Sequence, residues 1–296
     1  MKNQALTLTA VARMTSNYGE GLGNIASVQK VFRDGRTYAT RSRESLKNAI
    51  MVNSGMYDDL KVEVDGATQK MVDEDINASN CRALEGGYMN TSGQTKIRKS
   101  SFYLTDAVAC DEFVNETRFH NNLFLAGRYA RDNKINLQEK AKESGLMPYQ
   151  YEYDKSMKQY SLTIKLDEVG VDTNFSVEAS IEEKIDRVNS ILTAVENLAL
   201  TVKGNLDNAE PIFIVGGIGN YSTHYFENVV RVEKGLLNIS KDLKDKLNKG
   251  YKVGLLEGNN FINEAQIKEE LKPVTITSFF DQVKKEVKEY YASNQN

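Results

Sequence analysis

Cysteine, histidine and proline are scarce in this sequence of 296 residues, and each shortage excludes a class of structure. The two cysteines, Cys81 and Cys110, lie far apart and outside any CxxC pair, so they form no disulfide framework. With two histidines, His120 and His224, they provide too few clustered ligands for a structural zinc site, and we expect no metal and no cofactor. Because the chain has three prolines, no proline-rich linker divides it, and we expect a single domain over residues 1–296.

Long apolar runs are also missing, and none approaches the roughly 20 residues that a membrane-spanning helix needs. Residues 1–14 alternate between polar and apolar side chains, which is typical of neither a signal peptide nor a transit helix. The hydrophobic content of 40% and the charged content of 27% are those of an ordinary soluble globular protein. We therefore expect a cytoplasmic protein with no membrane partner.

The common catalytic and nucleotide-binding motifs HExxH, GxSxG, GxxxxGK[ST] and DxDxDG do not occur in the sequence. The acidic pair Glu182-Glu183 lies on a helix-periodic segment and is expected to be solvated. Asp34 lies in a basic stretch, where a carboxylate can orient a water or a metal, but a turn at Asp34-Gly35 accounts for it. The sequence predicts a protein that is not an enzyme.

Positive charge is concentrated at the start of the chain. Residues 1–52 contain eight lysines and arginines against three acidic residues, a local charge of +5 in a chain with a net charge of −3. A polyanionic ligand explains such a stretch. The alternative is a solvated loop with scattered charges.

The Asp34-Gly35 pair predicts a hairpin turn between strands over 25–32 and 37–39. Thr40 is then expected to cap a helix over 41–53. Arg41 and Arg43 would lie in its first turn, where cations oppose the helix dipole unless an anion binds there. A phosphate would satisfy the free N–H groups and both guanidinium groups. The alternative is that both arginines point into water.

Period-two alternation predicts two half-buried strands, over 5–14 and 160–166. Each would place polar side chains on an open face, including Thr7 and Thr9 on the first strand and Ser161 and Thr163 on the second. These faces lack the aromatic platform with which RNA-recognition modules stack bases. RNA, if bound, is expected along loops and helix ends.

The remaining clear elements are a strand over 101–109, a helix over 181–202 and a strand over 211–216, followed by a mostly helical C-terminal part. The resulting order is strand, helix, strand, strand, helix, strand. It predicts the α+β class with a modified ferredoxin-like, RNA-recognition (βαββαβ) core. Large insertions are expected at approximately 55–100 and 110–158.

A second basic cluster consists of Lys96, Arg98 and Lys99, followed closely by Ser100 and Tyr103. Hydroxyl, cationic and aromatic groups in this mixture suit phosphates and stacked bases. The alternative is a plain solvated surface.

Several segments match one known family in the same order. They are LTLTAVARM, SNYGEGLGNIASVQKV and GRTYATRSRESLKNAI near the start, EGGYMN and KIRKSSFYLTDAVA in the middle, and YSLTIKLDEVG, PIFIVGG, GLLEGNN and TITSFF further on. This series resembles the DevR-type CRISPR-associated proteins, the seventh Cas family, in the branch found in type I-B systems. No single motif is diagnostic, and the resemblance rests on their order along nearly the whole chain.

The resemblance implies a non-catalytic backbone subunit of Cascade, the RNA-guided surveillance complex, with finger and thumb elements inserted into its RNA-recognition fold. Several copies would polymerise head to tail along one CRISPR RNA (crRNA) and present it for pairing with target DNA in antiviral defence. The implied partners are crRNA, target DNA through the crRNA, copies of the chain itself, and other Cascade subunits. Those subunits are the large subunit, the subunit that caps the 5′ handle and the endonuclease that processes crRNA.

Carried over residue by residue, the resemblance implies RNA contacts in both basic clusters. The residues of the first cluster are Asn24, Lys30, Arg33, Arg36, Arg41, Ser42, Arg43 and Lys47. Those of the second, expected near a displaced nucleotide, are Lys96, Arg98, Lys99 and Ser100. Type III relatives carry a cleaving aspartate in the loop after the first strand; Asp34 lies in a comparable region but in a basic turn, so we do not assign cleavage to it.

Two other functions are compatible with the sequence. One is a standalone RNA-binding regulator, because the family takes its name from a developmental regulator. The other is a metal-dependent ribonuclease that uses Asp34.

Overall fold

The computed structural model describes residues 4–19 and 25–293. Along the chain, a helix twice connects one strand of the main sheet to another. The elements are β1 (Ala5–Thr15), α1 (Arg43–Asn53), β9 and β10 (Phe102–Leu104 and Ala107–Ala109), β13 (Lys155–Lys165), α3 (Ile181–Glu196) and β18 (Pro211–Gly219). Across the sheet the order is β18-β1-β13-β10, with antiparallel neighbours. This is the strand order of a ferredoxin-like core, and the predicted α+β class is confirmed.

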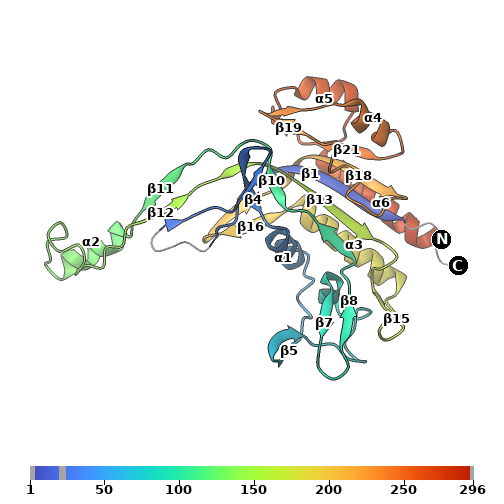
Figure 1. Cartoon of the computed structure of the whole chain (residues 1–296), viewed down its shortest axis with the longest axis horizontal. Coiled ribbons are helices and arrows are strands. Elements are labelled where there is room, and N and C mark those ends of the chain that lie inside the picture. Colours follow the sequence, from blue (N-terminus) through green and yellow to red (C-terminus); the bar gives the residue numbers. More distant parts are fainter. Residues whose placement is uncertain (1–3, 20–24, 294–296) are drawn as a thin grey trace.

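Further strands widen the sheet at both edges (Figure 1). At one edge β21 (Lys252–Leu255) pairs with β18. At the other, β4 (Arg36–Arg41) pairs with β10, and β3 (Lys30–Arg33) pairs with β4. The basic hairpin is therefore an edge of the central sheet.

Helices α1, α3 and α6 (Ile276–Ser293) cover one face of the sheet (Figure 1). Alternation in β1 sends Leu6 and Leu8 to this face, where they pack with Val188 of α3 and Phe280 of α6 in one core cluster. A buried Leu or Phe side chain contributes roughly 1.5–3 kcal/mol. This cluster fixes the helices on the sheet.

The opposite face of β1 and β13 is buried, so the predicted open polar face is wrong. Thr9 Oγ1 lies 2.7 Å from Ser161 Oγ, and Thr7 Oγ1 donates to the carbonyl of Thr223 at 3.0 Å. Thr163 is likewise buried. The reason is that the chain returns across the sheet after β18, and the hydroxyl groups are satisfied by one another and by its backbone.

The returning chain forms a second layer on this face. Its elements are β19 (Val232–Glu233), β20 (Leu236–Leu237), α4 (Lys241–Leu247) and α5 (Glu264–Leu271). Phe213 and Val253 of the sheet pack with Phe226 and Phe261 of the layer in a second core cluster. The helices α4, α5 and α6 agree with the predicted helical C-terminal part.

Two long excursions leave the core and separate in space (Figure 1). The first connects α1 to β9 and contains β5 (Val62–Asp65), β6 (Ala67–Lys70), the 3-10 helix η1 (Arg82–Gly86), β7 (Tyr88–Asn90) and β8 (Lys96–Arg98). The second connects β10 to β13 and contains β11 (Thr117–His120), α2 (Leu123–Asp132) and β12 (Tyr149–Glu152). We call residues 117–153 the arm. It extends away from the body of the molecule, and β12 also pairs in parallel with β2 (Ile25–Ala26).

The helix predicted over 181–202 ends earlier, at Glu196. Ala199–Val202 instead forms β16, which pairs with β17 (Asn205–Asn208). Between the two strands, Lys203 and Gly204 both have positive φ angles, of 47° and 77°. This is the backbone of a tight hairpin turn, which outweighs the helical periodicity. A further short hairpin consists of β14 (Val171–Asp172) and β15 (Val177–Glu178).

Candidate nucleic-acid interface

The hairpin β3–β4 has the turn that the sequence predicts. Asp34 and Gly35 have φ angles of 51° and 77°, and Arg33 lies directly opposite Arg36. Both arginines are exposed. Like charges directly opposite each other in a hairpin are unfavourable. The tip of the hairpin is therefore a place where a bound anion would relieve repulsion.

Helix α1 begins later than predicted, and Thr40 is not its cap. Ser42 is the N-cap, and its hydroxyl accepts from the backbone N–H of Ser45. The backbone N–H of Arg43 donates to Asp106 Oδ1 at 2.8 Å. Two backbone N–H donors that were predicted to be free for a phosphate are thus used by the protein itself.

Arg41 lies in strand β4 and is buried, so its predicted place in the first turn of the helix is wrong. Its Nε donates to the carbonyl of Thr15 at 3.0 Å, and Nη1 donates to Ser45 Oγ at 2.8 Å. Burial lowers the pKa of Arg41. Arg43, in contrast, is exposed and pairs with the adjacent Glu44. The two arginines do not form a common clamp.

Lys47 points into the protein from α1. Its ammonium donates to the carbonyl of Gly86 at 3.1 Å and to Ser100 Oγ at 2.8 Å, and it lies 4.6 Å from the centre of the Phe102 ring. Burial, and secondarily the Lys70 ammonium, lower the pKa of Lys47 to about 8. Lys47 and Ser100 therefore join α1 to the first excursion.

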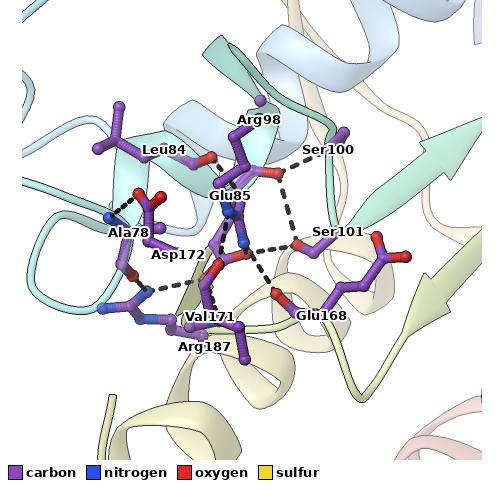
Figure 2. A network of polar contacts seen from close by, with 12 residues as sticks. Ala78, Leu84, Glu85, Arg98, Ser100, Ser101, Glu168, Val171, Asp172 and Arg187 are labelled. Atoms are coloured by element: carbon purple, nitrogen blue, oxygen red, sulfur yellow. Dashed lines mark hydrogen bonds and ion pairs between the residues drawn. The ribbon is translucent and has the colours of Figure 1, made fainter. Parts of the chain in front are cut away.

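Arg98 belongs to a buried network around Glu85 (Figure 2). One oxygen of Glu85 accepts from Arg98 Nη2 at 3.0 Å, and the other accepts from Arg187 Nη1 at 2.8 Å. Arg98 also donates to the carbonyls of Leu84, Glu168 and Val171. All three charged side chains are at most 7% exposed.

The same network ties the first excursion to the core, because Arg187 is on α3 and Glu85 is on η1. Ser101 Oγ and the backbone N–H of Gly170 complete the hydrogen bonds of the Glu85 carboxylate. A buried ion pair whose members are fully hydrogen-bonded mainly specifies one arrangement of the chain. The donors of Arg98 have internal partners. Its neighbour Lys99 is exposed, and Lys96 lies 5.5 Å from the centre of the Phe175 ring.

The structure brings part of the first cluster together around a hollow of about 300 Å³. Lys30, Arg33 and Ser42 line it, together with Asp106 and Val108. Lys30 also pairs with Glu152 at 2.5 Å, which joins the hairpin to the root of the arm. Asn24 lies outside the described residues.

A larger groove of about 1150 Å³ runs between the hairpin and the second layer. Its cations are Arg33, Arg36, Arg231 and Lys234, and its acids are Asp34, Asp106, Asp111, Glu112, Glu227 and Glu233. The groove is thus mixed in charge, with more acids than bases. In residues 4–19 and 25–293 no group of His, Cys, Asp or Glu side chains is arranged to hold a metal ion.

The arm carries an aromatic and cationic surface that the predicted site residues do not include. His120 stacks on Tyr151 at 4.6 Å and on Tyr149 at 5.5 Å between ring centres. The Arg118 guanidinium lies 3.4 Å from the centre of the Tyr153 ring. We call Arg118, His120, Tyr149, Tyr151 and Tyr153 the arm column.

The pairing of β11 with β12 explains the column, because Arg118 lies opposite Tyr151 and His120 opposite Tyr149. Alternate residues of a strand share one face, so the spacing of two along both strands aligns the five side chains. That spacing was the available signal in the sequence, although it did not reveal which segment pairs with which. Phe119, on the opposite face, is 60% exposed. Stacked rings beside cations are the surface that single-stranded nucleic acids bind.

Comparison with protein families assigns most of the chain. Residues 7–238 match the family model described as "CRISPR-associated negative auto-regulator DevR/Csa2". Two solved chains have similar folds. One, from "CRISPR RNA-guided surveillance complex, pre-nicking", has a TM-score of 0.58 and 9% identity, and covers 86% of this chain and 93% of that chain. The other, from "CRISPR RNA-guided surveillance complex", has a TM-score of 0.53 and 11% identity, with coverages of 86% and 90%.

No curated protein sequence matches this chain. Among the described residues, none of the helices has the length and apolar character required to cross a membrane.

Proposed function

The chain belongs to the CRISPR-associated DevR/Csa2 family, and from that premise we propose that it is a crRNA-binding backbone subunit of a Cascade-type surveillance complex. Its part is to hold the guide RNA and to present it for pairing with target DNA, without catalysing a reaction. The shared fold with chains of CRISPR RNA-guided surveillance complexes supports this proposal.

The observation that carries the proposal is the linkage between the hairpin tip and the arm column. Lys30 pairs with Glu152, and β2 pairs with β12, so the exposed arginines and the stacked rings belong to connected elements. A backbone held by cations beside bases stacked on aromatic rings is the usual mode of single-strand binding.

Within this proposal the predicted site residues divide into two groups. Arg33, Arg36, Arg43, Lys96 and Lys99 are the RNA phosphate ligands, with Lys30 at the root of the arm and the arm column as an addition. Arg41, Ser42, Lys47, Arg98 and Ser100 hold the scaffold through their internal hydrogen bonds. The segments 55–100 and 110–158 are insertions into the RNA-recognition core, and the second contains the RNA-facing arm.

Neighbouring copies would associate head to tail. The acidic excess of the groove and the cations of the arm, which include Arg128 and Arg131, are complementary in charge. Because the two surfaces differ, such a contact is heterologous, and it produces a filament along the RNA when the rotation between copies does not close a ring. Other Cascade subunits would then bind at its ends and along its side.

The test is to purify the protein from cells that also contain a CRISPR array and the companion subunits, and to sequence the bound nucleic acid. We expect uniform CRISPR-derived RNAs on a multi-subunit particle. A mixed pool of transcripts on a monomer would contradict the proposal and favour a standalone RNA-binding regulator. Cleavage of complementary RNA with Mg²⁺ that disappears in Asp34→Ala would instead identify a ribonuclease.

A further inference from the structure

A second aromatic and cationic cluster lies at the opposite edge of the sheet from the hairpin, between α4 and the end of β18. The rings of Tyr221 and Tyr225 are parallel, with centres 4.7 Å apart and an interplanar angle of 2°. Tyr225 in turn stacks on Tyr251 at 5.3 Å. We call these three residues the tyrosine stack.

Contacts with the second core cluster and with β1 hold the inner end of the tyrosine stack in place. Tyr251 is 9% exposed and belongs to the core cluster of the second layer, where Phe226 meets it edge-on at 5.0 Å. The backbone N–H of Tyr225 donates to Thr7 Oγ1 at 3.2 Å, so the segment is fixed to β1. Gly219 lets the Tyr251 ring approach closely, because a Cβ there would lie 1.9 Å from the Tyr251 hydroxyl oxygen.

Tyr221, at the outer end of the stack, is 43% exposed although its ring stacks on Tyr225. An exposed tyrosine that is already oriented by a ring behind it can accept another planar group with little loss of conformational entropy. A nucleobase has the required flat surface.

Cations accompany the rings. Residues 241–252 contain five lysines and two aspartates, in a chain with a net charge of −3. Lys244 and Lys252 pair with Glu270 and Glu286. Lys246 and Lys249 instead lie against tyrosines, 4.2 Å from the ring centre of Tyr225 and 5.3 Å from that of Tyr221. The Lys249 ammonium donates hydrogen bonds to the Tyr225 and Tyr221 hydroxyls, and these bonds raise the pKa of Lys249.

We infer that the tyrosine stack and the lysines beside it form a second binding site for single-stranded nucleic acid, separate from the hairpin and the arm. A base stacks on Tyr221, and Lys249 meets the adjoining phosphate. The strand is either an unpaired part of the guide RNA or an unpaired DNA strand. This inference goes beyond the proposed function, because it does not depend on which surface holds the guide.

The test measures fluorescence anisotropy of labelled decauridine RNA and decathymidine DNA on the full-length, RNA-free protein over a range of salt concentrations. Tyr221→Ala is expected to weaken binding at least about fivefold, the lower end of the loss when one stacking ring is removed. Tyr221→Phe keeps the ring and is expected to restore binding. Lys249→Ala is expected to reduce the salt slope by about 0.7, whereas the matched control Lys285→Ala, on exposed α6 surface, leaves it unchanged.

Tighter binding of the RNA assigns the site to the guide, and tighter binding of the DNA assigns it to an unpaired DNA strand. Unchanged affinity in Tyr221→Ala overturns the inference. If Tyr221→Ala alters only the sedimentation of the RNA-free protein, Tyr221 makes a contact with another protein chain. That result also overturns the inference. Arg33→Ala/Arg36→Ala separates the two proposals, because loss of binding in that variant alone supports the proposed function and contradicts the second site.

Discussion

Arginines that look alike in the two basic clusters of the sequence have different structural roles. Arg33 and Arg36 are exposed at a hairpin tip, whereas Arg98 is buried with Glu85. The difference arises from the partners: Glu85 comes from the 3-10 helix that precedes Arg98 and is shared with Arg187, 102 residues further along the chain. A cluster of basic residues predicts positive charge but does not determine whether the charge faces solvent or the interior.

The largest effect is expected for Glu85→Gln, which tests the structural role of the buried Arg98. The substitution keeps the shape of the side chain but leaves the Arg98 and Arg187 guanidinium groups without their shared carboxylate. Removing one partner of a buried ion pair typically costs about 3–5 kcal/mol, and we expect that loss in the free energy of unfolding measured with urea. The control Glu44→Gln, whose partner Arg43 is exposed, should change it little.

The second test uses the pH dependence of Lys47. Its pKa is about 8 in the folded protein, below the ordinary value of 10.5, so the unfolded chain binds more protons between these two values. The lowered pKa of Lys47 destabilises the folded protein, and this destabilisation is fully present below about pH 8. The free energy of unfolding therefore rises with pH between about 8 and 10.5. We therefore compare the free energies of unfolding of the parent and of Lys47→Met. The difference between them should change by on the order of 2–3 kcal/mol across this pH range. A pH-independent difference would contradict the assignment.

For the exposed arginines, Arg33→Ala/Arg36→Ala should weaken RNA binding without lowering the free energy of unfolding, because the two side chains repel each other in the free protein. If each arginine contacts one phosphate, the slope of log affinity against log salt falls by about 1.4 for a single strand. Filter binding over a salt series measures this slope. A lowered midpoint of unfolding with an unchanged salt dependence of binding would instead show that these arginines stabilise the fold, as Arg98 does.

The smallest expected effect is that of Arg43→Ala. One lost phosphate contact reduces the salt slope by about 0.7. Arg41→Lys is the informative companion, because Arg41 is buried and its bonds to Thr15 and Ser45 need the guanidinium. It should lower the melting temperature without altering the slope, and the reverse pattern would contradict the division between these neighbours.

Local patterns in the sequence were sufficient for several elements. Asp34-Gly35 predicts its hairpin turn because both residues tolerate positive φ. The alternation in residues 5–14 likewise predicts β1. The same alternation wrongly predicts that the polar face of β1 is open to solvent. That face is buried, because the Thr7 and Thr9 hydroxyls form hydrogen bonds inside the interface between the sheet and the second layer.

The candidate site was less accessible to sequence reasoning. The arm column depends on the pairing of residues 117–120 with 149–152, and the tyrosine stack joins Tyr221, Tyr225 and Tyr251 from segments on both sides of α4. Periodicity identifies which residues share a face of one strand, but not which strand lies opposite.

The order of strands and helices, the helical C-terminal part and the concentration of positive charge near the N-terminus follow from the sequence, because each depends on residues close together in the chain. The tertiary structure decided which cations are free. Arg41, Lys47 and Arg98 are used internally because carbonyl and carboxylate groups from distant segments meet them, and a buried cation is stable only when such partners are present. It also decided that aromatic rings far apart in sequence form two stacked surfaces, one on the arm and one beside α4.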